Sequence, residues 1–200
     1  MNLVVALTVF AAIFPAELPD KTFVATLVLA TRFSPLPVWI GAAAAFTVQT
    51  IVAVAAGGAL SLLPRRPVHA VAAALFALGA VVVLTAKDSQ AREAQEVEAE
   101  LVDVPPKPSA RRAALTTFAV LFVAEWGDLS QLLTAAFAAK YRDVVGVGVG
   151  ALAALLIVAG LGAAGGRALL RVVPVVWVRR VAAAVFAAVA VATAVETIRG

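Results

Sequence analysis

The amino-acid sequence predicts an all-α, polytopic membrane protein with six transmembrane helices arranged as two inverted three-helix repeats. Three observations predict this class. Of the 200 residues, 63% are hydrophobic and 14% are charged, whereas about a quarter of the residues in a soluble domain are charged. Several apolar runs reach the ~20 residues that cross a bilayer. A polar motif within the first run returns in the fourth.

Six apolar runs follow one another along the chain, at about residues 3–30, 38–63, 68–86, 113–139, 144–170 and 175–198. Prolines and basic residues separate them, and the only long polar stretch lies between the third and fourth. We therefore divide the chain into a first repeat (1–86), a polar loop (87–112) and a second repeat (113–200). No Lys or Arg precedes Lys21, so the first run lacks the basic start of a cleaved signal peptide and is interpreted as a retained helix.

Shorter matches support a duplication. The tetrapeptide Ala-Ala-Gly-Gly at 55–58 returns at 163–166, and the stretch at 71–76 resembles that at 181–186, in the same order as the motifs. Since each repeat has three spans, an odd number, the two repeats must insert with opposite orientations. Inverted repeats of this kind are common in secondary transporters, which bind substrate near the bilayer midplane at discontinuous helices.

Basic residues in the loops predict the orientation. Ten lie on the side of the polar loop and five on the other, namely Arg32, Lys87, Arg92, Lys107, Arg111, Arg112, Arg167, Arg171, Arg179 and Arg180 against Arg65, Arg66, Lys140, Arg142 and Arg199. The positive-inside rule then places the polar loop in the cytoplasm and both termini outside. The same rule explains the basic composition without a nucleic-acid partner. The Ala-, Val- and Arg-rich usage and the absence of an N-terminal extension favour a bacterial cell membrane.

The two polar motifs are the candidate functional residues. The first reads Glu17-Leu18-Pro19-Asp20-Lys21-Thr22 and the second Glu125-Trp126-Gly127-Asp128-Leu129-Ser130. An ionisable group at the centre of a membrane helix costs roughly 2.5–3.5 kcal/mol on insertion scales, and such groups usually mark substrate pathways. The alternative is that these acids form buried salt bridges that fix the helix register.

The spacing of the acids predicts a cation site. Residues three apart share a helix face, so Glu17 should lie beside Asp20, and Lys21 can reach Glu17 at a spacing of four. If the repeats pack around a pseudo-twofold axis, four carboxylates converge. Oxygen ligands suit hard divalent cations such as Ca²⁺, Mg²⁺ and Mn²⁺. Hydroxyl groups are predicted as metal ligands beside the acids, namely those of Thr22, Ser130, Thr26, Thr134 and Thr47. The predicted accessory residues are Gln49, Gln131 and Lys21.

Helix-breaking residues within the motifs predict an irregular backbone. Pro15 and Pro19 each remove an amide donor and leave a carbonyl without its helical partner, and Gly127 takes the place of Pro19 in the second motif. Free carbonyls are tolerated in a membrane where they line a cavity. No cysteine is present and the one histidine lies near the end of a predicted span, so a thiolate or imidazole site is not expected.

The net charge of the two motifs predicts that cation transport is coupled to proton transport. The four carboxylates sum to −4, and Lys21 reduces this to −3. A low-dielectric cavity with that charge should take up protons or a cation, so the two compete, which is the basis of metal/proton antiport. The alternative function is an exporter of small cationic metabolites such as basic amino acids. We expect no enzyme and no cofactor, and the bilayer, the metal ion and protons as partners; a monomer and a homodimer both remain open.

The duplicated motif resembles the Glu-x-Gly-Asp-(Lys/Arg)-(Thr/Ser) signature of the Gcr1-dependent translation factor family of calcium and manganese cation/proton antiporters. The resemblance covers essentially the whole chain and implies export of Mn²⁺ or Ca²⁺ from the cytosol. Two positions depart from the pattern: Pro19 replaces a glycine, and Leu129 replaces a basic residue. The matching acids and hydroxyls carry over a cation site at Glu17, Asp20, Thr22, Glu125, Asp128 and Ser130.

Overall fold

Helices form all of the regular structure in the described part of the chain. The computed structural model describes residues 1–18, 20–85, 95, 97–99, 109–172 and 175–199, with side chains omitted at 166–172, 175 and 199. The helices are α1 (Leu3–Glu17), α2 (Lys21–Arg32), α3 (Pro35–Leu60), α4 (Arg65–Thr85), α6 (Ala110–Ala124), α7 (Leu129–Tyr141), α8 (Val144–Val172) and α9 (Val175–Arg199).

Four to six candidate membrane spans account for these helices. Stretches of α3, α4, α8 and α9 are each long and apolar enough to cross a bilayer. The remaining helices form two bent pairs, α1 with α2 at 63° and α6 with α7 at 73°, and each pair has the form of a broken span or a re-entrant loop. The predicted all-α polytopic membrane protein is confirmed, and each motif lies at a break between two half-helices.

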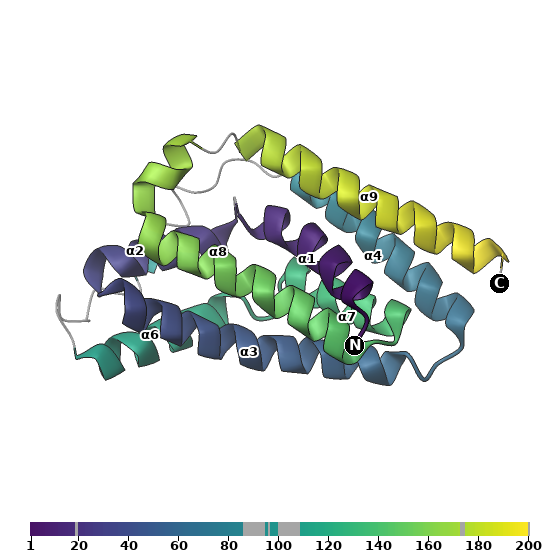
Figure 1. The fold of residues 1–200 in the computed structure, drawn as a ribbon, viewed down its shortest axis with the longest axis horizontal. Coiled ribbons are helices and arrows are strands. Elements are labelled where there is room, and N and C mark those ends of the chain that lie inside the picture. Colours follow the sequence, from purple (N-terminus) through teal and green to yellow (C-terminus); the bar gives the residue numbers. More distant parts are fainter. Residues whose placement is uncertain (19, 86–94, 96, 100–108, 173–174, 200) are drawn as a thin grey trace.

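The two halves of the chain interlock (Figure 1). The half-helices α1 and α2 pack against α8, whereas α6 and α7 pack against α3. The long helices α3 and α8 contact each other, and α4 lies along α9. Each broken span is therefore supported by a long helix from the other half. The division of the chain at residues 86 and 112 stays a prediction. Most of the polar loop, including most of the acidic residues between 93 and 103, lies outside the described residues.

Small residues let the half-helices approach the long helices closely. A Cβ atom added at Gly41 of α3 would overlap the carbonyl oxygen of Ala114 in α6, and one added at Gly150 of α8 would overlap that of Ala6 in α1. In a membrane, where apolar contact with lipid competes with contact between helices, such close backbone approach drives packing. The two interfaces use the same device, as the repeat predicts.

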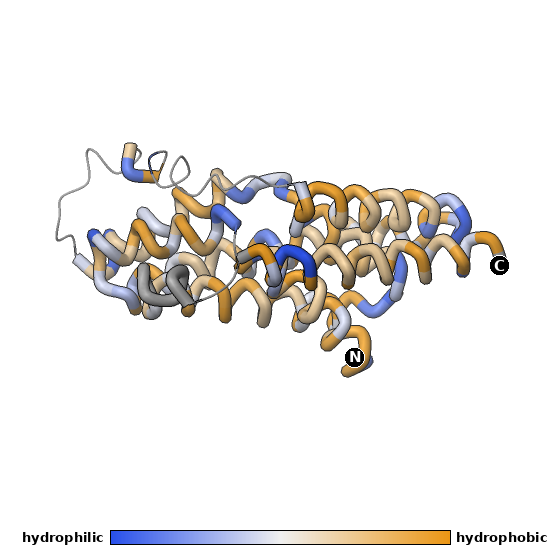
Figure 2. Tube along the Cα trace, turned by 90° about the horizontal axis from the view of Figure 1, so that it is seen from above, coloured by the Kyte–Doolittle hydropathy of each residue, from blue (hydrophilic) through white to orange (hydrophobic). Residues whose placement is uncertain are grey.

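The outer surface is apolar. The long helices carry mainly the hydrophobic colours of Figure 2, and large apolar side chains are exposed on most helices, for example Leu7 (59%), Ile51 (59%), Val81 (55%) and Val191 (64%). Exposed apolar surface on this scale marks contact with a membrane or a partner rather than with water. The polar groups that are buried inside the bundle are therefore separated from this apolar outer surface.

Candidate cation site

The acids of each motif flank a helix break. Glu17 is the last residue of α1 and Asp20 is the N-cap of α2. In the same way Glu125 is the C-cap of α6 and Asp128 the N-cap of α7. The prediction that each pair shares one helix face is therefore wrong. The pairs are close because the chain turns between their members, so one acid belongs to each half-helix.

The two breaks differ in sequence. Pro15 lies inside α1, and the helix continues past it to Glu17, so the first break lies between Glu17 and Lys21. Pro19 lies outside the described residues. In the second motif Gly127 has a φ of 77°, a left-handed conformation that costs a residue with a side chain about 1–2 kcal/mol. The Gly127 N–H donates to Gln131 Oε1 at 2.8 Å. The predicted irregularity at Gly127 is confirmed.

Acids from both motifs converge. Glu17, Asp20 and Asp128 each offer a carboxylate oxygen within 4.8 Å of the others. Glu17 is 2% exposed, and the other two side chains are partly buried. Three carboxylates at this separation repel one another strongly in a low-dielectric interior, which makes the cluster a natural place for a divalent cation or protons.

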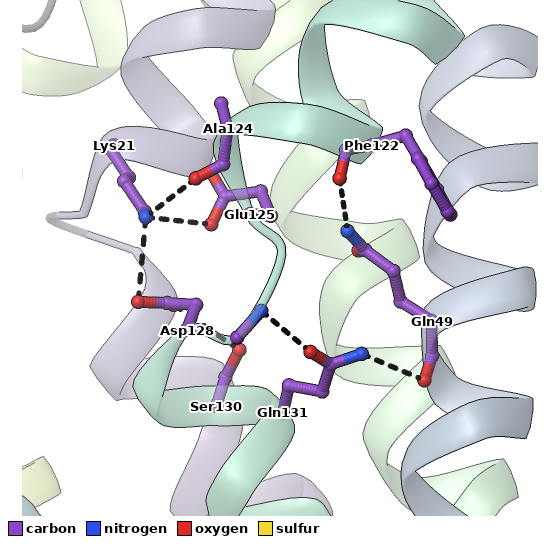
Figure 3. Close-up of polar contacts among 9 residues, drawn as sticks. Lys21, Gln49, Phe122, Ala124, Glu125, Asp128, Ser130 and Gln131 are labelled. Atoms are coloured by element: carbon purple, nitrogen blue, oxygen red, sulfur yellow. Dashed lines mark hydrogen bonds and ion pairs between the residues drawn. The ribbon is translucent and has the colours of Figure 1, made fainter.

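Lys21 joins the two motifs, but not as predicted. Its Nζ donates to the Ala124 carbonyl oxygen at 2.9 Å and lies 3.6 Å from Glu125 Oε2 and 3.5 Å from Asp128 Oδ1 (Figure 3). We expected Lys21 to reach Glu17 at a helical spacing of four. The break between α1 and α2 removes that spacing, and the ammonium group instead turns to the second motif.

Buried oxygen atoms remain without a donor or cation in this region. Glu17 Oε2, Glu125 Oε1 and Thr22 Oγ1 have no hydrogen-bond partner among the described residues. A buried polar atom without a partner costs about 1–3 kcal/mol, and more when it is charged. These oxygen atoms are therefore available to bind a proton, a water molecule or a cation.

A small pocket opens between α2, α3 and α7. Its volume is about 20 Å³, room for about one water molecule or ion. Its polar lining contains half of the predicted ligands and one residue that we did not predict, Thr50: Thr22, Gln49, Thr50, Glu125, Ser130, Gln131 and Thr134. Glu125 is the one motif acid in this lining, and the cluster of Glu17, Asp20 and Asp128 lies outside it. Thr50 follows Gln49 as a second polar residue within an apolar run, which was the available signal.

Two predicted ligands do not belong to the site. The Thr26 hydroxyl donates to the carbonyl oxygens of Thr22 and Phe23, and the Thr47 hydroxyl to that of Ala43. Both hydroxyls are bonded within their own helices, and neither residue lines the pocket.

Two glutamines fix the second break against α3. Gln49 Nε2 donates to the Phe122 carbonyl oxygen at 3.1 Å, and Gln131 Nε2 donates to the Gln49 carbonyl oxygen at 3.4 Å (Figure 3). Ser130 Oγ lies 3.5 Å from Asp128 Oδ2. These contacts hold the end of α6 and the start of α7 in place, so the accessory residues act on the backbone of the site.

A family model for the divalent cation/proton antiporter GDT1 matches residues 5–91 and 113–200, which include both motifs. The chain belongs to the GDT1 family. A GDT1-like protein of Synechocystis is 32% identical over 174 residues, covering 80% of this chain and 84% of its own length. GDT1-like protein 4 of rice is 33% identical over 154 residues, and the chloroplast protein PAM71 of Arabidopsis is 34% identical over 163 residues.

The matches with the plant proteins cover 70% and 72% of this chain and 54% and 44% of theirs, so the chain spans about half the length of these GDT1 relatives. No solved structure matches it. The resemblance deduced from the two motifs is confirmed. Within the family pattern, this chain keeps the acids and hydroxyls of both motifs but has Pro19 and Leu129 at two other positions.

Proposed function

We propose that this protein is a secondary transporter that exchanges a divalent cation, Mn²⁺ or Ca²⁺, for protons. The convergence of Glu17, Asp20 and Asp128 within 4.8 Å, at the breaks of two membrane spans, carries the proposal. Carboxylates from both repeats meet there, so movement of one half-helix relative to the other would change the coordination. Membership of a family described as divalent cation/proton antiporters supports the same reaction.

The site's charge explains the exchange. Glu17, Asp20, Glu125 and Asp128 contribute −4 when ionised, and Lys21 leaves −3. A divalent cation and protons would neutralise the same oxygens, so they compete. Metal binding to such groups releases protons and depends on pH. The unpartnered oxygens of Glu17 and Glu125 mark where either would bind.

The hydroxyl and amide groups complete the proposed coordination. The Thr22 hydroxyl has no hydrogen-bond partner among the described residues, and Ser130 and Gln131 line the same pocket. Neutral oxygen ligands suit Ca²⁺ and Mn²⁺, and a flexible set of six to eight of them suits Ca²⁺ best. We assign Glu17, Asp20, Asp128 and Glu125 as ligands, with Thr22 and Ser130 as neutral donors.

The size of the pocket favours an ion over a metabolite. A volume of about 20 Å³ is far below the ~300–1,000 Å³ of pockets that enclose organic ligands. An amino-acid exporter would need a larger chamber beside Glu125, the motif acid that lines this pocket. The ammonium of Lys21 already lies between Glu125 and Asp128, so this chain supplies its own amine where such a substrate would bind.

The direction of transport rests on the predicted orientation. With the polar loop in the cytoplasm, an inward proton gradient would drive the metal out of the cytosol. The experiment is metal flux into proteoliposomes that contain the purified protein, under an imposed pH gradient, with Mn²⁺ and Ca²⁺ tested separately. Glu17→Gln and Glu125→Gln are the test variants, and Glu98→Gln, an exposed acid of the polar loop, is the matched control.

We expect flux that follows the imposed proton gradient in the wild type and in Glu98→Gln, and flux near that of empty vesicles in both test variants. Flux that ignores the gradient would replace antiport with passive conduction. Transport of lysine or arginine without metal flux would replace the cation with a cationic metabolite as the substrate.

A further inference from the structure

A second cavity, with opposite charge, lies at the other end of α4 and α9 from the polar loop. It has a volume of about 290 Å³ and is lined by Arg65, Arg66, His69, Glu196 and Thr197. Arg65 and Arg66 are the first two residues of α4, and Glu196 and Thr197 lie in the last turn of α9. The cavity thus forms where the two antiparallel helices end together, far in sequence from both acidic motifs.

The single carboxylate of this cavity is neutralised by a buried lysine. Lys140 Nζ lies 3.1 Å from Glu196 Oε2 and donates to Thr193 Oγ1 at 2.7 Å, with its side chain 3% exposed. His69 Nδ1 is 3.9 Å from the same carboxylate oxygen. The Glu196 carboxylate is therefore already paired with Lys140 and lies close to His69.

Arg65 and Arg66 have no such partner. Both side chains are exposed, and neither makes an ion pair or side-chain hydrogen bond to another described residue. With Glu196 balanced by Lys140, the cavity keeps the two positive charges of the arginines even when His69 is neutral. The positive end of the α4 dipole and the negative end of the α9 dipole meet here and offset each other, so the arginine side chains supply the positive field. Such a cavity attracts an anion.

Apolar surface starts directly beside the cavity. On α9, Ile198 (82% exposed), Val195 (37%) and Val191 (64%) lie three or four residues apart, so they share a face that leads away from the helix end. On α4, Val71 (61%) and Leu78 (51%) are exposed seven residues, about two turns, apart. The ligand that fits both the charge and this surface has an anionic head and an apolar tail.

We propose that this cavity binds the phosphate headgroup of an anionic phospholipid. Arg65 and Arg66 hold the phosphate through their guanidinium groups, which match its geometry better than ammonium groups do, and the acyl chains lie along the exposed apolar faces of α4 and α9. Basic pockets between membrane helices bind anionic lipid headgroups in this way. Free phosphate shares the headgroup chemistry but makes no use of the apolar faces.

The test is native mass spectrometry of the full-length protein in detergent, with phosphatidylglycerol, phosphatidylcholine or inorganic phosphate added. The test variant is Arg65→Gln/Arg66→Gln. The matched control is Arg111→Gln/Arg112→Gln, because this second arginine pair is also exposed in the first turn of a membrane helix but lines no described cavity. Arg65→Lys/Arg66→Lys keeps the charge and removes the guanidinium geometry.

We expect the wild type and the control to retain phosphatidylglycerol in preference to phosphatidylcholine. The Gln pair should lose roughly 10- to 30-fold of this affinity, since each arginine near an anionic lipid surface contributes about a fivefold factor. The Lys pair should bind with intermediate affinity. Equal loss in both Gln pairs, or retention by the Arg65/Arg66 variant, would overturn the site. Displacement of the lipid by millimolar inorganic phosphate would overturn the lipid as its ligand.

Discussion

The two helix breaks place their acids in corresponding positions but differ in the residues around them. Each places one acid at the end of a half-helix and another at the N-cap of the next. The second break turns at Gly127 in a left-handed conformation, whereas the first has Pro19 in the corresponding position. The first break carries Lys21, and the second has Leu129 instead. The duplication has kept the positions of the acids while the turn and the counter-ion have diverged.

Because the second motif has Leu129 in place of a basic residue, Lys21 is the one basic residue of the two motifs. Its ammonium group pairs with Glu125 and Asp128 of the other repeat. Asp128 is consequently shared, because it also belongs to the acidic group with Glu17 and Asp20. A symmetric ancestor of the two motifs would hold a counter-ion on each side. In this chain Asp128 contacts the one counter-ion of the two motifs and also belongs to the cluster of acids.

The largest effect is expected from Asp128→Asn, which removes the residue that joins the two breaks. Loss of its charge takes away a proposed cation ligand and one partner of Lys21. We expect divalent cation affinity to fall by more than about 10-fold, the lower end of the loss that follows even when an outer-shell partner is removed. Isothermal titration with Mn²⁺ and Ca²⁺ measures it. Glu98→Gln is the charge-matched control, and an unchanged affinity would exclude Asp128 as a ligand.

A smaller effect is expected when the missing counter-ion is restored. Leu129→Lys adds a second ammonium and changes the net charge of the site from −3 to −2. At about 8 Å and an effective dielectric constant of 20, the added ammonium would repel each unit charge of the cation by about 2 kcal/mol. Screening by solvent and salt reduces this repulsion, so affinity for a divalent cation should fall by about 10-fold or more. Leu129→Met keeps the site's charge and should bind as the wild type does. Tighter binding in Leu129→Lys would contradict the charge argument.

The turns of the two breaks should respond differently to substitution. Gly127→Ala forces a side chain into the left-handed region, which costs about 1–2 kcal/mol. Thermal unfolding in detergent should show the loss, and Gly127→Asn should recover part of it because asparagine tolerates this conformation. There is open space for the added Cβ, so a loss that is equal in both variants would point to a cause other than backbone strain.

The smallest expected effect is on the local stability of the chain at the starts of the long helices α3 and α8. Asp143 precedes α8 and accepts hydrogen bonds from the N–H groups of Gly146 and Asn2 at 3.0 and 2.6 Å, whereas Ser34 before α3 makes no such side-chain bond. These donors hold the pKa of Asp143 below its ordinary value of 3.8. A lowered pKa stabilises the fold above the ordinary value, and this contribution is lost as the pH falls below it.

Hydrogen exchange of the Asn2 amide tests that asymmetry. Protection of this amide should be retained from pH 7 down to about 4 and should decrease below it, after correction for the intrinsic rate. Asp143→Asn should remove the pH dependence of the protection. A wild-type protection factor that stays constant through this range would show that the Asp143 contact does not form.

Sequence reasoning predicted the spans, the acids and the hydroxyls because each depends on local patterns. Twenty-residue apolar runs and their interruption by Glu17, Asp20, Glu125 and Asp128 are visible without a structure. The same reasoning gave the wrong partner for Lys21, since it assumed a continuous helix where the chain breaks. A spacing rule holds only within one helix, and the prolines that predicted the break also removed the basis for that rule.

Contacts between residues far apart in the sequence could not be predicted from the sequence alone. Lys140 counted as a loop residue in the orientation argument, yet it lies in the last turn of α7 with its side chain 3% exposed, paired with Glu196 of α9. Thr50 entered the site because α3 packs against α7 of the other repeat. Both outcomes depend on how the repeats interlock, which local composition does not encode.

The central claim is that the two breaks form one cation site, and a double-mutant titration tests it most directly. Calorimetry with Mn²⁺ and with Ca²⁺ would compare the wild type, Glu17→Gln, Asp128→Asn and the double variant. A shared site predicts one ion per chain, a large loss in each single variant, and a double variant that loses much less than the sum of the two, since groups acting as a unit are not additive. Two ions per chain, or fully additive losses, would mean that each break binds its own ion and would contradict the account.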